Sequence, residues 1–153
     1  QIPRPPVKSL KLEFLDMEVL QKPSEMIKVG DVVKANLRCR ANDDFQNMKL
    51  RFEIVASDNT LTGTMFLADK IVAKKGEVFT LEIGICTDHL APGTYRFDLL
   101  AFEHNDFGIQ DWVDRVEGAP ILEIVKRKDG DLEWLPQYWG HTRLEDIRLF
   151  VKN

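Results

Sequence analysis

The sequence predicts an all-β fold, an antiparallel β-sandwich of the immunoglobulin-like or jelly-roll-like kind with a C-terminal extension. Two observations lead to this prediction. Several short segments carry an apolar residue at every second position, which is typical of strands with one buried face. Turn-forming residues such as Pro92-Gly93 separate these segments, and no long helical pattern lies between them.

The first predicted strand covers residues 10–19 and changes its phase midway. Leu12 and Phe14 share one phase of the alternation, whereas Met17 and Val19 share the other. A change of phase requires one additional residue in the strand, so the sequence predicts either a bulge or a strand that leaves one sheet for the other.

The later strands alternate more regularly. Each has an apolar file expected to face the core and a polar file expected to face solvent. A further strand follows the turn at Pro92-Gly93. The regular segments are 33–41, 49–54 and 79–85.

Two cysteines, Cys39 and Cys86, lie within these alternating segments, and both are expected to be small core residues. A disulfide between them is an alternative in an oxidising compartment, but two cysteines do not make a disulfide framework. The reduced state is favoured, and it points to the cytoplasm.

Three regions are expected along the chain. The proline-rich residues 1–8 are typical of a linker from an upstream domain that is absent here. Residues 9–128 form the sandwich, and residues 129–153 form the extension. Within the extension, residues 143–152 alternate as a strand would but also fit a helical stripe. Such an apolar tail is expected to cover a sheet edge or to pair with a second copy.

The composition argues against several functions. Basic residues number 21 and acidic residues 25, a net charge of −4, which disfavours a nucleic-acid binder. No apolar run is long enough for a transmembrane helix. The motifs of nucleotide, cofactor and nucleophilic sites are missing, so no cofactor is expected. The three histidines lack the spacing of metal ligands, so no metal site is expected either.

Four arginines are the first candidate site residues. Each is expected on the outer face of a strand, where a planar guanidinium can bind a carboxylate or phosphate in a bidentate way. The alternative is a solvated sheet face on which the arginines pair with Glu53 or Asp98. The four are Arg38, Arg40, Arg51 and Arg96.

A polar loop that ends in an aromatic residue supplies the other candidates. Sugars stack on aromatic rings while planar polar side chains hold their hydroxyls. His104, Asn105 and Trp112 are therefore expected to contact a sugar. The alternative for Trp112 is that it caps the core.

Several motifs together resemble a known family. They are the turn Leu90-Ala91-Pro92-Gly93-Thr94-Tyr95, the pair Asp111-Trp112, the strand Ile121–Val125, and Thr62-Gly63-Thr64 before the central strands. In this order they resemble the C-terminal carbohydrate-binding domain of Wzt-type subunits, which belong to ABC transporters that export O-antigen polysaccharides. The resemblance spans about residues 10–125.

The resemblance implies a non-catalytic domain that binds the non-reducing end of an O-antigen polysaccharide, with an acidic or phosphate cap as one form of that end. It also implies an upstream nucleotide-binding domain, a membrane transporter subunit as partner, and a cytoplasmic location at the inner face of the inner membrane. In some family members the C-terminal strand exchanges between two protomers, so a homodimer is expected. The alternatives are a dimerisation or interaction module that binds no glycan, and a sandwich-fold enzyme that modifies sugars.

Overall fold

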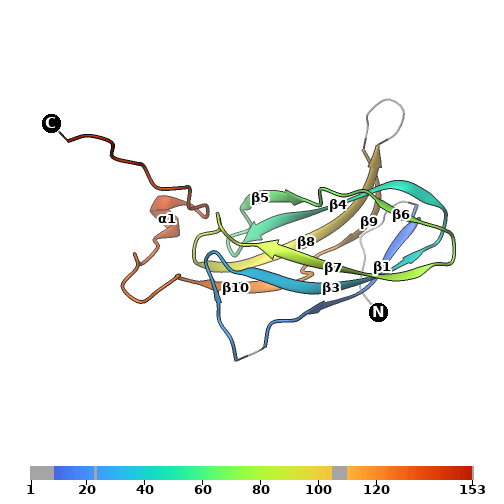
Figure 1. Ribbon diagram of the computed structural model, residues 1–153, viewed down its shortest axis with the longest axis horizontal. Helices are drawn as coiled ribbons and strands as arrows, with labels where there is room; N and C mark the ends of the chain where they lie inside the picture. Colours follow the sequence, from blue (N-terminus) through green and yellow to red (C-terminus); the bar gives the residue numbers. More distant parts are fainter. Residues whose placement is uncertain (1–8, 23, 105–109, 153) are drawn as a thin grey trace.

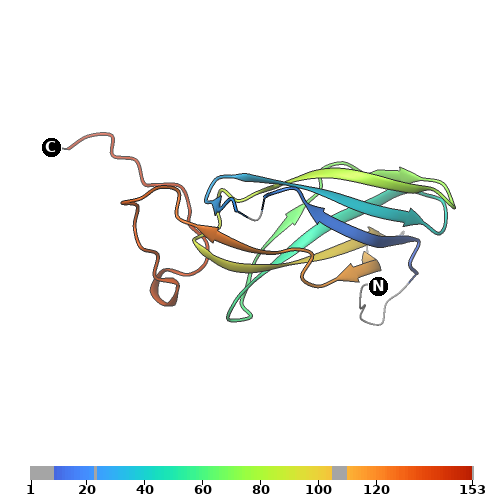
Figure 2. The ribbon, with the colours of Figure 1, turned by 90° about the horizontal axis from the view of Figure 1, so that it is seen from below.

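The computed structural model describes residues 9–22, 24–104 and 110–152. Within them the chain forms two sheets that pack face to face as a β-sandwich, with a C-terminal segment extending from one end (Figures 1 and 2). The predicted fold class is therefore confirmed. Strands make up nearly all of the regular structure, and α1 (Pro136–Trp139) is the one helix of the described residues.

The smaller sheet has three antiparallel strands in the order β1-β3-β7. Its strands are β1 (Leu12–Val19), β3 (Val32–Ala41) and β7 (Val78–Cys86). A register shift between Phe14 and Asp16 gives β1 a bulge. Because of this bulge, Met17 and Val19 pack against the core as Leu12 and Phe14 do, and the predicted change of phase is confirmed.

The larger sheet has seven strands. Five follow the order β2-β10-β8-β4-β5, while β6 pairs with β4 and β9 pairs with β8. All pairs are antiparallel except the short β2–β10 pair. The strands are β2 (Ile27–Lys28), β4 (Phe45–Ala56), β5 (Leu61–Phe66), β6 (Ile71–Ala73), β8 (Gly93–His104), β9 (Gln110–Val116) and β10 (Ile121–Val125).

The core lies between the two sheets and is built by the predicted apolar files. Leu37 and Cys39 of β3 belong to the same buried cluster as Phe52 and Ile54 of β4. Phe97 of β8 packs edge-on against Phe52 at 5.8 Å between ring centroids. A buried carboxylate links the two sheets: the amide of Phe14 donates to Asp114 Oδ2 at 2.8 Å. The two sheets are therefore tied together at the bulge of β1.

Two expectations about local structure are wrong. Cys86 is exposed, because it follows Ile85 and so lies one position out of phase with the inward file of β7. Residues 143–152 form neither a strand nor a helix. Cys39 is buried as expected, and both thiols are free.

The C-terminal segment is docked on the sandwich at residues 141–143. The amide of Ala91 donates to His141 O at 3.1 Å, and the amide of Arg143 donates to His89 O at 2.9 Å. The hydroxyl of Tyr95 lies 2.6 Å from Ala91 O and 3.1 Å from His141 O. Beyond this attachment the chain leads away from the sheets (Figure 1). None of the helices in the described residues is long and apolar enough to cross a membrane.

Candidate functional site

The predicted site residues lie on two opposite surfaces of the sandwich. Arg38 and Arg40 project from β3 on the outer face of the three-stranded sheet, since their neighbours Leu37 and Cys39 face the core. The remaining described candidates lie on the outer face of the seven-stranded sheet: Arg51, Arg96, His104 and Trp112. Asn105 lies outside the described residues. The structure therefore does not bring the four arginines together.

The arginines of the three-stranded sheet have a solvated setting. Arg40 Nη1 lies 3.4 Å from Glu13 Oε1 on the neighbouring strand, and Asn42 donates to the same carboxylate oxygen at 3.1 Å. Arg38 is exposed and lies opposite Asp16. This face fits the alternative of cross-strand pairs in solvent.

The outer face of the seven-stranded sheet carries a connected network of arginines and carboxylates, which we call the arginine network. Arg51 contacts Glu53 with Nε and Nη2 at 3.2 and 3.1 Å. Arg96 contacts Asp98 in a bidentate way at 2.9 and 3.0 Å. Arg115 joins the two pairs, because its Nη2 lies 3.3 Å from Asp98 and 3.7 Å from Glu53.

Asp98 is the centre of this network. Its side chain is 1% exposed, and it accepts from Arg96, from Arg115 and from the amide of Gly118 at 3.0 Å. The hydrogen bond to Asp98 raises the pKa of Arg96 above its already high normal value, so Arg96 stays a cation. The network is therefore held in place by a buried carboxylate.

Aromatic rings lie directly against the arginine network. The guanidinium of Arg51 stands over the ring of Phe102 at 4.8 Å from its centroid, and that of Arg115 lies 5.7 Å from the centroid of Trp112. The rings of Phe66 and His104 pack edge-on against Phe102. Cations over aromatic faces are favourable, so this layer is fixed by contacts of both kinds.

A hollow of about 640 Å³ opens beside the network, where β9 meets the beginning of β1. We call it the Trp112 hollow. It is lined by Ser9, Lys11, Glu103, Gln110, Asp111 and Trp112. Gln110 Oε1 accepts from Arg51 Nη1 at 2.5 Å, and Trp112 is 37% exposed. The hollow is thus continuous with the arginine network.

The chemistry of this surface suits a polar ligand with one apolar face. Trp112 offers ring surface, while Gln110, Asp111 and Lys11 offer planar or charged groups for hydroxyls. The network itself is balanced in charge: three guanidinium groups face three carboxylates, those of Glu53, Asp98 and Glu117. In the described part of the chain, no group of three His, Cys, Asp or Glu side chains is arranged to hold a metal ion.

Arg115, Gln110 and Lys11 are not among the site residues that the sequence predicts. For Arg115 the reason is a bulge. Trp112 and Arg115 are three positions apart, which simple alternation would place on opposite faces. In the structure Trp112 pairs with Phe102 and Arg115 pairs with Leu100, because a register shift in β9 lies between them. The shift brings Trp112 and Arg115 to the same face.

Comparison with known proteins gives one family. A family model described as the Wzt C-terminal domain matches residues 7–133. A solved structure titled "Crystal structure of the C-terminal domain of wzt" superposes with a TM-score of 0.68 at 14% sequence identity, and the match covers 92% of this chain and 84% of that chain. No curated protein sequence matches.

Proposed function

This chain belongs to the Wzt C-terminal domain family, and from that premise we propose that it binds the non-reducing end of an O-antigen polysaccharide and selects it for export. The family is associated with O-antigen ABC transporters, where it forms a non-catalytic module of the transporter ATPase. The proposed partners are an upstream nucleotide-binding domain and a membrane transporter subunit. They would place the domain at the cytoplasmic face of the inner membrane.

The observation that carries the proposal is the Trp112 hollow beside the arginine network. The partly exposed indole ring of Trp112 lines this hollow together with an amide, a carboxylate and an ammonium group. Such a combination is typical of sites that stack a sugar ring and bind its hydroxyls. The hollow lies at a corner of the sheet, where β9 begins, which suits the end of a chain better than its interior.

We propose further that an acidic or phosphate cap would lie against Arg51 and Arg115. Both guanidinium groups border the hollow, through Gln110 and through the ring of Trp112. Because Glu53 and Asp98 already neutralise them, a cap has to compete with these carboxylates. We therefore expect an acidic cap to strengthen binding only modestly, by about 1 kcal/mol.

Recognition of the non-reducing end can be tested by removing that end from the polysaccharide. The probe is the O-antigen polysaccharide of the organism that encodes this chain, used intact and after removal of its non-reducing terminal residues. Isothermal titration should give at least tenfold weaker binding for the trimmed polysaccharide. Equal affinity for both would contradict recognition of the end, while leaving glycan binding itself in place.

Dimerisation is a second proposal, and it rests on the C-terminal segment. Leu144, Ile147, Leu149, Phe150 and Val151 are all highly exposed, and Ile147 is exposed completely. An extended segment with alternating apolar residues can add a strand to a sheet edge of another chain. We propose that residues 147–152 pair with a second copy of this chain.

A further inference from the structure

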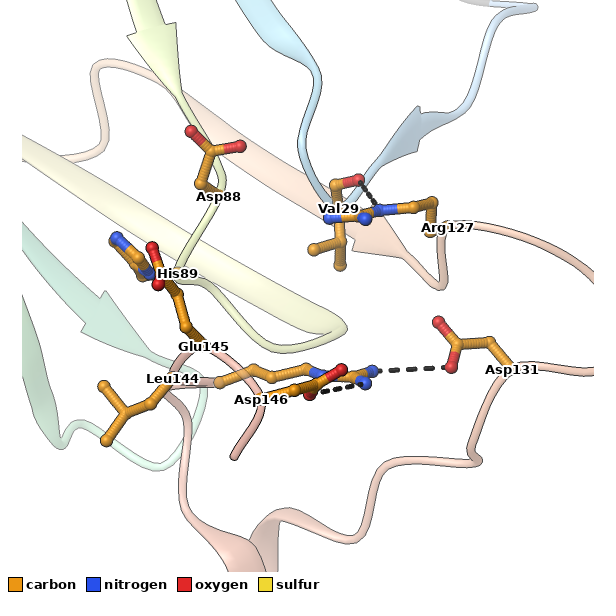
Figure 3. A pocket seen from close by; sticks show the side chains of 9 residues that line it. Val29, Asp88, His89, Arg127, Asp131, Leu144, Glu145 and Asp146 are labelled. Carbon is orange, nitrogen blue, oxygen red and sulfur yellow. Dashed lines mark hydrogen bonds and ion pairs between the residues drawn. The ribbon is translucent and has the colours of Figure 1, made fainter. Parts of the chain in front are cut away.

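A second pocket lies at the opposite end of the sandwich from the Trp112 hollow. It has a volume of about 350 Å³ and opens between the sandwich and the docked C-terminal segment (Figure 3). We call it the tail pocket. It lies near the beginning of β8, whereas Trp112 pairs with Phe102 near the end of that strand. Nine steps along a strand separate Gly93 from Phe102, so the two sites are about 30 Å apart.

The tail pocket is formed jointly by the sandwich and the tail. Val29, Asp88, His89 and Arg127 come from loops at one end of the sandwich, as Figure 3 shows. Asp131, Arg143, Leu144, Glu145 and Asp146 come from the C-terminal segment. The tail pocket therefore combines residues that are far apart in the sequence, and it does not exist without the C-terminal segment.

The walls of the tail pocket are held in place by hydrogen bonds. On the sandwich side, the buried hydroxyl of Thr87 donates to Asp31 O at 2.7 Å and accepts from the amide of Gly30 at 3.0 Å, which joins two loops. On the tail side, Arg143 Nη1 lies 3.4 Å from Asp131 Oδ1 and its Nη2 lies 3.8 Å from Asp146 Oδ1. The pocket is therefore largely formed before any ligand arrives.

Aromatic contacts within the C-terminal segment also hold it in place. The indole N–H of Trp134 donates to Gly140 O at 2.6 Å, and its ring packs edge-on against Trp139 at 5.3 Å. The guanidinium of Arg143 lies 6.0 Å from the centroid of Trp134. Arg143 is thus held between an aromatic ring and two carboxylates and can act as a fixed hydrogen-bond donor.

Three polar side chains of the pocket are exposed to solvent and have no partner among the described residues. Among the described residues, the side chains of Asp88, His89 and Glu145 make no hydrogen bond or ion pair, and Arg127 binds only the carbonyl oxygen of Val29, at 3.3 Å. Acceptors and donors therefore line one small cavity together. Such a mixture matches hydroxyl groups, which donate and accept at the same time.

We propose that the tail pocket is a second saccharide site, which takes one neutral or amino sugar unit. Its volume is near the lower end of small-ligand pockets, about 300 to 1,000 Å³. Four carboxylates face two guanidinium groups in its lining, so a uronic acid is disfavoured. The inference rests on the ligand class of the proposed function but uses none of the residues of the Trp112 hollow.

The test is a titration of the ¹⁵N-labelled chain followed by two-dimensional NMR. The probes are glucose, galactose, mannose, rhamnose, glucosamine and glucuronic acid at millimolar concentrations, which detect a binding free energy of about 4 kcal/mol. At least one neutral or amino sugar should shift the amides of residues 88–90 and 143–146 in a saturable way. Glucuronic acid should bind these residues most weakly.

Two variants separate this inference from the proposed function. Asp88→Asn combined with Glu145→Gln should weaken sugar binding at the tail pocket about tenfold, since each substitution retains the shape of the side chain but removes the charged acceptor. Trp112→Ala should leave sugar binding at the tail pocket unchanged. The inference is overturned if no neutral or amino sugar shifts these amides, if glucuronic acid binds equally well, or if the double variant binds as the parent chain does.

Discussion

Asp98 illustrates how a single residue organises the candidate site. Its carboxylate lies on the outer face of a sheet yet is almost completely buried, because Arg96 and Arg115 cover it. Removing the charge leaves two guanidinium groups without their shared partner. Leaving a buried polar or charged group without a partner lowers the free energy of unfolding by more than a typical hydrogen bond contributes.

We expect Asp98→Asn to lower the free energy of unfolding by about 2 kcal/mol, measured by urea denaturation. Glu117→Gln is the matched control, since Glu117 is mostly exposed and lies 3.8 Å from Arg115. The control should stay within about 0.5 kcal/mol of the parent chain. Equal effects of both substitutions would show that Asp98 does not organise the network.

The two cysteines are expected to differ in their reactivity. Burial, together with the charge of Asp114, raises the pKa of Cys39 to about 12, whereas Cys86 is exposed. Because the thiolate is the reactive form, a thiol reagent at pH 8 should label one cysteine in the folded chain and both in denaturant. Mass spectrometry of the peptides should place the first label on Cys86. Rapid labelling of Cys39 in the folded chain would contradict its burial.

The alternation of apolar and polar residues predicted on which face of its strand most site residues lie. It did not predict which of these residues lie close together. Arg38, Arg40, Arg51 and Arg96 are all outward as expected, but two sheets divide them. The face of a residue follows from its own strand, whereas its neighbours depend on the pairing of strands, which alternation does not reveal. The face on which Arg115 lies could not be predicted either, because it depends on the register shift in β9.

The strands of the sandwich could be predicted from the sequence, whereas the conformation of the C-terminal segment could not. The bulge in β1 left a visible change of phase in the sequence, so it was predicted from Leu12 and Phe14 against Met17 and Val19. The tail alternates at Ile147 and Leu149 as a strand would, but in the described residues it has no neighbouring strand beyond the bridge between Leu90 and Thr142. A strand needs a partner, and the sequence of one chain does not supply it.

Tyr95 provides the most specific test of how the tail is attached. Its buried hydroxyl lies within hydrogen-bond distance of both Ala91 O and His141 O. Tyr95→Phe should cost about 1 kcal/mol of stability. It should also speed hydrogen exchange at the amide of Arg143, which bonds to His89 O. Tyr138→Phe is the control, because Tyr138 is 78% exposed, and unchanged exchange in Tyr95→Phe would argue against this attachment.

The proposed pairing of the C-terminal segment with a second copy can be tested without shortening the chain. Replacing Ile147, Leu149 and Val151 together by serine should convert a dimer to a monomer in light scattering, because these side chains would face the second copy. Replacing Arg148 and Lys152 by serine is the matched control and should leave the dimer intact. A monomeric parent chain, or a dimer that survives the first change, would contradict the pairing.

The sandwich as a whole could be predicted because its core depends on many alternating positions at once. The positions of the candidate sites on its surfaces could not be predicted. Trp112 and the arginine network lie on the outer face of the seven-stranded sheet, Arg38 and Arg40 lie on the three-stranded sheet, and the tail pocket lies at one end. Each of these places depends on contacts between segments distant in the sequence.

We propose that the seven-stranded sheet, and not the three-stranded sheet, binds the polysaccharide. The most direct test compares the affinity of Trp112→Ala with that of Arg38→Ala combined with Arg40→Ala, by isothermal titration with the polysaccharide of the encoding organism. We predict at least tenfold weaker binding for Trp112→Ala, the loss of about 1.4 kcal/mol of stacking, and a change below about twofold for the double variant. Undiminished binding by Trp112→Ala, or a large loss in the double variant, would contradict binding at the seven-stranded sheet.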